Sequence, residues 1–301
     1  MGVQLTENGE QRNEMFFEMY WQYFVAGLVL WLTVKLGLYM KKSRSTETIV
    51  EDKQTKAHRV SRNDSDSESS PDDDLCPALP LDLKHIPLNF SKIPQEESLK
   101  RSEEFYQLMN RRRTVRHFST KGVPKEIIRN IIKTAGTAPS GAHTEPWTYV
   151  VVSDPETKRK IREIIEEEEE INYKKRMGKV WTTDLKPLRT NWVKEYLTDA
   201  PYLILVFKQT YSLKPDGGKK IHYYNEQSVS LAAGILLAAI QNAGLVSLTS
   251  TPLNCGPALR ALLQRPISEK LTLLLPVGYP AEACLVPDLT RKPLDDILVE
   301  F

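Results

Sequence analysis

One segment late in the chain restricts the fold more than any other: residues 225–244, NEQSVSLAAGILLAAIQNAG. Its residues are apolar on almost every side of a helix rather than along one stripe. A helix of this kind has to be covered by other elements, so we expect it to be buried at the centre of a domain. The rest of the domain must therefore supply apolar faces that pack against it.

Short apolar runs elsewhere predict strands that could form such faces. Four runs are apolar enough to be buried strands: 147–154, 202–208, 245–251 and 271–279. One helix is predicted before the first strand, at 124–139, which begins with Pro124 and has an apolar face of isoleucines. Another is predicted between the last two strands, at 256–264. Strands separated by helices favour a layered α/β or α+β domain.

The N-terminal part has a different pattern. Residues 20–34, YWQYFVAGLVLWLTV, are almost entirely apolar, and the run continues after Lys35. About 20 such residues cross a bilayer, so we predict a transmembrane helix at 20–40, after a short segment at 1–19. A cleaved signal peptide is less favoured, because basic residues follow the run and no small-residue cleavage site does. A buried helix of a soluble domain is the third interpretation.

Charge around this run predicts its orientation. Lys41, Lys42 and Arg44 follow it, whereas Arg12 is the only basic residue before it. The positive-inside rule then places the later residues in the cytosol, as part of a single-pass protein of the plasma membrane or a vesicle membrane. Two glycosylation sequons, at 63–65 and 89–91, would reverse this orientation if they were used in cells.

Residues 41–84 are predicted to be a disordered tether. They are mostly polar and include NDSDSESSPDDD at 63–74, so they cannot bury enough apolar surface to fold. The folded domain is therefore expected at 85–301. The whole chain has 41 Lys and Arg against 39 Asp and Glu, a balance that gives no general attraction to nucleic acid. Its three cysteines are far apart and suggest neither zinc nor a disulfide framework.

Three local patterns could carry chemistry. In RRRTVRHF (111–118) clustered arginines can bind a phosphate dianion, although a solvated basic patch or a targeting signal would look the same. GTAPSGAHTEPW (136–147) is a turn that can offer backbone N–H groups, and TSTPLNCGP (249–257) is a strand end rich in hydroxyls. No dinucleotide fingerprint, P-loop or catalytic triad can be identified, which fits a protein whose cofactor carries the chemistry.

The run IIEEEEEINYKKRM (164–177) is predicted to be a helix with unequal glutamates. At 100° per residue, Glu169 and Tyr173 lie together at the margin of the apolar stripe, and Glu167 and Glu170 point to solvent. Glu168 falls inside the stripe, where a carboxylate needs a partner. Either the helix is distorted there or it covers a cleft, and both suit a lid with Gly178 as a hinge.

In this order, RRRTVRHF, TAPSGAHTEPWTYVVV, LLAAIQNAGL and LPVGYP resemble the nitroreductase superfamily of flavoproteins. IIEEEEEINYKKRMG, LRTNWVKEYL and PDLTRKPLDD extend the resemblance over about residues 85–301, to the branch that removes iodide from iodotyrosines. The resemblance implies an α+β fold with a central sheet flanked by helices. It also implies a homodimer with FMN sites at the subunit interface.

The resemblance further implies the site residues. Those expected to contact FMN are Arg112, Arg113, Thr114, Val115, Arg116, Pro139, Ser140, Thr249, Ser250, Thr251 and Arg291. Thr251 is the catalytic candidate, because a hydrogen bond near the flavin N5 atom favours stepwise electron transfer. Which of Arg111, Arg112 and Arg113 contact the phosphate stays open. Substrate contacts are implied for Glu169, Tyr173, Lys194 and the backbone N–H of Ala142.

The implied reaction is reductive deiodination of mono- and diiodotyrosine by reduced FMN, with NADPH as the ultimate reductant. No nicotinamide motif is present, so the immediate donor, including a separate reductase, stays open. One alternative is a broad flavin reductase of nitroaromatics or quinones, which would have no use for a clamp around an amino-acid zwitterion. The other is a membrane-tethered binding protein without activity.

Overall fold

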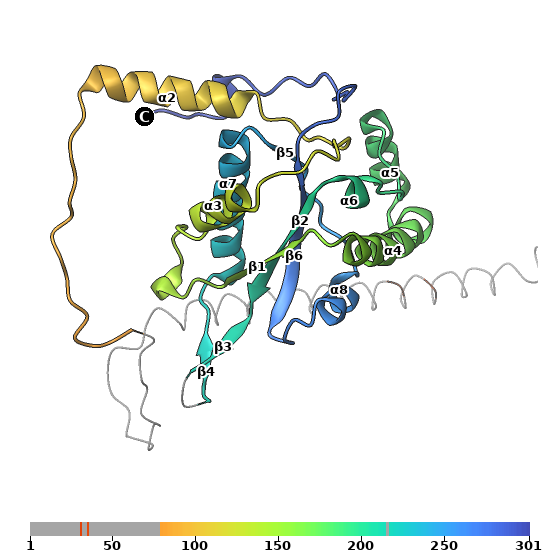
Figure 1. The fold of residues 1–301 in the computed structure, drawn as a ribbon, viewed down its shortest axis with the longest axis horizontal. Coiled ribbons are helices and arrows are strands. Elements are labelled where there is room, and N and C mark those ends of the chain that lie inside the picture. Colours follow the sequence, from red (N-terminus) through yellow and green to blue (C-terminus); the bar gives the residue numbers. More distant parts are fainter. Residues whose placement is uncertain (1–30, 32–34, 36–78, 215–216) are drawn as a thin grey trace, which may run out of the picture. The chain divides into compact units, whose positions relative to one another are not determined.

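The computed structural model describes residues 79–214 and 217–301, together with Trp31 and Lys35 (Figure 1). The chain divides into two compact units, Met1–Leu75 and Cys76–Phe301. In the first unit Trp31 and Lys35 are helical, and the Lys35 ammonium lies 4.3 Å from the centre of the Trp31 ring.

The predicted segment at 1–19, nearly all of the predicted transmembrane helix at 20–40 and most of the predicted tether at 41–84 lie outside the described residues. Among the residues that are described, no helix is both long enough and apolar enough to cross a bilayer.

The second unit is built on a four-stranded sheet with the order β1-β2-β6-β5. Its strands are β1 (Trp147–Val152), β2 (Tyr202–Gln209), β6 (Glu269–Gly278) and β5 (Val246–Ser247). Every neighbouring pair is antiparallel, so the layered domain is of the α+β type. A separate hairpin is formed by β3 (Tyr211–Leu213) and β4 (Lys219–Ile221).

The strand expected at 245–251 is only partly formed. β5 pairs with β6 through Val246 and Ser247, and the same register returns only at Ser250, which exchanges two 2.9 Å backbone hydrogen bonds with Leu274. Continuing this register places Pro276 opposite the interrupted part. Proline has no N–H to donate, so the hydrogen-bond ladder between β5 and β6 is broken there. The polar residues that follow then lead the chain out of the sheet.

Alternate residues of β2 face two separate hydrophobic cores, as the period of a strand requires. Leu203, Leu205 and Phe207 are fully buried beside α4 (Pro155–Ile171), α6 (Tyr196–Asp199) and α8 (Gly256–Leu262). Ile204 and Val206 are fully buried beside α3 (Lys125–Ala135) and α7 (Asn225–Asn242). Figure 1 shows these two groups of helices on opposite faces of the sheet, with α2 (Gln95–Asn110) across one end.

The helix predicted at 225–244 is confirmed as α7, but the expectation that it is buried all round is wrong for one face. Val229, Leu236 and Ile240 are in the core, whereas the side chain of Leu231 is 55% exposed. Next to it, Ile235 lines an apolar groove of about 530 Å³ between α7, α3 and α2. Among the described residues no element covers Leu231, so an apolar composition did not ensure complete burial of this helix.

Candidate functional site

Four of the predicted cofactor residues follow directly after helix α2, where the chain turns toward the sheet. Arg112, Arg113, Thr114 and Arg116 line a cavity of about 270 Å³, and Arg291 reaches it from the C-terminal segment. Backbone carbonyls hold these arginines in place. Arg291 donates to the carbonyl of Arg112 at 2.9 Å and to that of Asn110 at 3.1 Å, while Arg113 donates to the carbonyl of Pro287.

This arginine cavity carries positive charge that the described part of the chain does not neutralise. Within those residues, no carboxylate forms an ion pair with Arg112, Arg113 or Arg291. Burial lowers the pKa of Arg112, and the charges of Arg291 and Arg113 lower it further. An anion in the cavity would relieve this repulsion, and paired guanidinium groups suit the geometry of a phosphate.

The structure also narrows the choice among the three consecutive arginines. Arg111 ends helix α2 with an exposed side chain and is not among the lining residues of the cavity. Arg112 and Arg113 are both partly buried and both line it. The neighbouring Val115 differs from them, because its side chain is only 4% exposed and packs in the core. Only the backbone of Val115 could therefore face a ligand.

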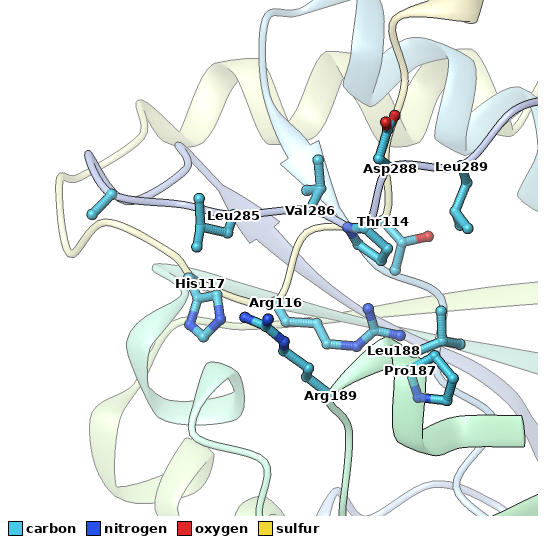
Figure 2. A pocket seen from close by; sticks show the side chains of 12 residues that line it. Thr114, Arg116, His117, Pro187, Leu188, Arg189, Leu285, Val286, Asp288 and Leu289 are labelled. Atoms are coloured by element: carbon cyan, nitrogen blue, oxygen red, sulfur yellow. The ribbon is translucent and has the colours of Figure 1, made fainter. Parts of the chain in front are cut away.

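A larger cavity of about 600 Å³ adjoins the arginine cavity and shares five lining residues with it: Thr114, Arg116, Leu188, Pro287 and Leu289. Figure 2 shows the side chains of Arg116, His117 and Arg189 below the segment that carries Leu285–Leu289. Together the two cavities are lined by arginines, by one carboxylate (Asp288) and by apolar side chains of residues 187–188, 285–287 and 289. This lining suits a ligand that has both an anionic end and an apolar part.

A third cavity, of about 160 Å³, contains three of the four predicted substrate residues and also has Arg116 in its wall. Glu169 and Tyr173 reach it from the end of α4 and the turn that follows, and Lys194 from the segment before α6. Thr249, Ser250 and Thr251 line its other side. The structure therefore brings together residues as far apart in the sequence as Arg116 and Thr251, which are separated by 135 positions.

Glu169 and Lys194 form a loose buried ion pair. The Lys194 Nζ atom lies 3.7 Å from the Glu169 Oε2 atom, and the two side chains are only 8% and 14% exposed. Nζ also lies 5.3 Å from the centre of the Tyr173 ring. Burial lowers the pKa of Lys194, although the Glu169 charge opposes this effect. Because the pair is longer than a tight charged hydrogen bond, both groups retain capacity for a ligand with opposite charges at one end.

Two further acidic residues of α4 support this arrangement, Glu166 and Glu168, and the sequence had singled out only Glu168. Glu166 accepts the backbone N–H of Lys194 at 2.6 Å and pairs with Arg162 at 2.8 Å. The spacing of Arg162 and Glu166 was the only available signal, and such i,i+4 pairs are common on helices. Glu168, which lacked a partner in the sequence interpretation, pairs with Arg176 at 2.7 Å.

The helix distortion that Glu168 suggested is present, but it begins four residues later. After Ile171 the helix continues as a π-turn from Asn172 to Arg176, closed by the N–H of Met177 donating to the carbonyl of Asn172 at 2.8 Å. The wider turn places Arg176 within reach of the Glu168 carboxylate.

Three predicted residues lie elsewhere in the chain. Pro139, Ser140 and Ala142 belong to the loop between α3 and β1 and are not among the residues that line the three cavities. Ser140 accepts the N–H of Glu145 at 2.9 Å. Ala142 has a φ of 49°, which is uncommon for a residue with a side chain and often marks a functional backbone position.

Comparison with known proteins agrees with this fold. Residues 109–279 match the profile of the nitroreductase family. The chain belongs to the nitroreductase family. Its similarity to individual members of that family extends well beyond these core residues. Iodotyrosine deiodinase 1 of Homo sapiens is 66% identical over 217 residues, which are 72% of this chain and 75% of that protein.

Other members of the nitroreductase family are comparably similar. Iodotyrosine deiodinase of Danio rerio is 68% identical over 217 residues (72% of this chain, 74% of that protein), and that of Hydra vulgaris 62% over 234 residues (78% and 85%). Among solved structures, oxidized iodotyrosine deiodinase bound to FMN and 3-iodo-L-tyrosine superposes with a TM-score of 0.57 at 32% identity, covering 65% of this chain and 98% of that chain.

Proposed function

We propose that this member of the nitroreductase family is an FMN-dependent enzyme that removes iodide reductively from mono- and diiodotyrosine. The observation that carries the proposal is the cavity in which Glu169, Tyr173 and Lys194 meet, with Arg116 shared between this cavity and the arginine cavity. The similar proteins named iodotyrosine deiodinase, and the solved one that binds FMN and 3-iodo-L-tyrosine, support it.

The arginine cavity fits the phosphate of FMN, because its guanidinium groups lack carboxylate partners within the described residues. Arg112, Arg113 and Arg291 would hold the phosphate, with Thr114 and Arg116 toward the flavin ring. Thr249, Ser250 and Thr251 would offer hydroxyls to the ring, and Thr251 would hold a hydrogen bond near N5. When bound, FMN supplies the electron pair that reduces the carbon–iodine bond.

The substrate cavity suits an amino-acid zwitterion. The Glu169 carboxylate would bind the ammonium group, while Lys194 and the Tyr173 hydroxyl would bind the carboxylate. The backbone N–H of Ala142 would donate to the phenolate oxygen. Iodine lowers the pKa of a phenol, so a site that binds the phenolate selects halogenated tyrosine. The carbon–iodine bond takes up an electron pair and a proton, and tyrosine and iodide leave.

A second copy of the chain would complete the site. Pro139, Ser140 and Ala142 do not line the cavities of their own chain, and the open apolar face of α7 provides a surface for a partner. In a homodimer the loop between α3 and β1 of one chain would lie over the flavin bound by the other. The membrane helix at 20–40, the cytosolic position of the domain and NADPH as ultimate reductant complete the proposal.

The proposal is tested with the purified full-length protein. It should be yellow, release FMN on heating, and liberate iodide from diiodotyrosine when dithionite is the reductant. Reduction of nitroaromatics without release of iodide would favour the general reductase instead. A colourless protein from which no FMN can be extracted would remove both enzymatic interpretations.

A further inference from the structure

Asn172 is the most completely buried polar residue beside the substrate cavity, with 1% of its surface exposed. It is the first residue of the π-turn that ends α4. Its Nδ2 atom donates to Glu169 Oε1 at 3.3 Å and to the carbonyl of Leu253 at 3.4 Å. Its Oδ1 atom accepts from Arg176 at 3.1 Å and from Asn254 Nδ2 at 3.4 Å.

These bonds join the two walls of the substrate cavity. Glu169 belongs to the wall made by α4, whereas Leu253 and Asn254 come after Pro252, which follows the hydroxyl segment that ends in Thr251. A buried amide satisfied on both its donor and acceptor sides fixes its own rotamer and also the groups it contacts. The position of the Glu169 carboxylate is therefore tied to the position of the loop after Thr251.

The π-turn is what makes this connection possible. Its i→i+5 bond from Met177 to Asn172 widens the turn, so that Arg176 reaches back to both the Asn172 amide oxygen and the Glu168 carboxylate. π-turns inside helices are rare and are found mostly at functional sites. Asn254 has a φ of 64°, a left-handed conformation that asparagine tolerates better than most residues. The π-turn and the left-handed residue Asn254 are thus joined through the buried side-chain amide of Asn172.

We propose that Asn172 is a positioning residue that couples substrate binding at Glu169 to the placement of Thr251 beside the flavin. This inference rests on the proposed function of the same cavity. When the substrate ammonium binds Glu169, the Asn172 amide transmits the fixed position of that carboxylate to the loop 251–254. A substrate of a general reductase that does not contact Glu169 is not affected by this coupling.

The test compares the full-length protein with Asn172→Ala and Asn172→Asp, and uses Glu170→Gln as a matched control. Glu170 lies on the same helix and pairs with exposed Lys174, outside the cavity lining. Four quantities are measured for each protein: flavin content, the Kd of 3-iodotyrosine from flavin absorbance, the kcat and KM of iodide release, and the turnover of a small nitroaromatic.

Asn172→Ala should keep its flavin, bind 3-iodotyrosine about tenfold more weakly because a hydrogen bond to a charged group is lost, and also have a lower kcat. Asn172→Asp should be worse, since it places a second carboxylate against Glu169. Nitroaromatic turnover should stay within about twofold of the wild type, as should every property of Glu170→Gln, because surface substitutions are usually near neutral.

A folded Asn172→Ala protein with unchanged Kd and kcat would overturn the inference, and so would an equal loss of iodide release and nitroaromatic turnover. If neither variant folds, Asn254→Gly decides, because glycine keeps the left-handed backbone and removes only the amide bonded to Asn172. It should lower kcat for iodide release, and an unchanged kcat would refute the coupling. A wild-type protein that releases no iodide would instead refute the proposed function.

Discussion

Replacing Glu169 by glutamine separates the substrate clamp from the rest of the flavin site. The change removes one negative charge and keeps the shape and the oxygen that accepts from Asn172. Two unit charges 3.7 Å apart attract by about 4 kcal/mol at the effective dielectric of about 20 that suits protein sites. Part of this attraction is offset by desolvation, because both side chains are largely buried.

The expected loss follows from the cost of leaving a charge without its partner. Removing one member of a buried, hydrogen-bonded pair typically costs about 2–5 kcal/mol, so kcat/KM for iodide release should fall at least about thirtyfold. In Glu169→Gln both the substrate ammonium and Lys194 lose their carboxylate. The arginine cavity is untouched, so flavin content should be unchanged.

Iodide release from diiodotyrosine and the reduction of a small quinone are measured on the same preparation. Glu170→Gln, on the exposed side of the same helix, is the control for charge and folding. Quinone reduction should continue at the wild-type rate in both variants. An equal loss of the two activities in Glu169→Gln, or no loss of iodide release, would refute the assignment of Glu169 to the substrate.

Four further predictions follow from the same structure. Arg112→Ala should weaken FMN binding at least about tenfold, as expected for a lost charged hydrogen bond, while Arg111→Ala should retain FMN, measured by equilibrium dialysis. Iodotyrosine should protect residues 160–195 from trypsin, and absence of protection would refute a lid there. Because burial lowers the pKa of Lys194, the KM for iodotyrosine should rise with pH before the ordinary value of 10.5 is reached. Burial raises the pKa of Glu269, but hydrogen bonds from two neighbouring side chains outweigh it and hold the pKa below 4.5. Ionised Glu269 therefore stabilises the folded state above pH 4.5, and this stabilisation is lost as the pH falls. The Tm of Glu269→Gln should depend less on pH in that acidic range than the Tm of the wild type.

The main elements could be predicted because their signals are local. Apolar runs of strand length gave β1, β2 and β6, and the isoleucine face after Pro124 gave α3. The strand at 245–251 was overestimated, because its length depends on Pro276 in a strand that is distant in the sequence. An apolar run reports that a segment can be buried, but not whether its partner can form the ladder.

The site was only partly predictable from the residues themselves. Helical geometry placed Glu169 beside Tyr173, but the approach of Lys194 came from the resemblance to a known family, since no local pattern links them. A spacing of 100° per residue holds only for a regular α-helix and does not predict a π-turn. The pairing of Glu168 with Arg176 was therefore missed.

The exposed apolar face of α7 could not be predicted from the sequence for a different reason. Leu231 is apolar and exposed, and the proposed homodimer would cover it with a surface of the second chain. The position of Ala142, away from the cavities that it was expected to complete, has the same explanation in the proposed homodimer. Neither feature follows from the packing of a single chain.

The central claim is tested most directly by a single turnover. The flavin of the purified full-length protein is reduced without oxygen, excess reductant is removed, and 3-iodotyrosine is added while flavin absorbance and free iodide are followed together. We expect the flavin to be reoxidised and iodide to appear at the same rate and in stoichiometric proportion to flavin. Flavin that stays reduced in the presence of iodotyrosine, with no iodide released, would contradict it.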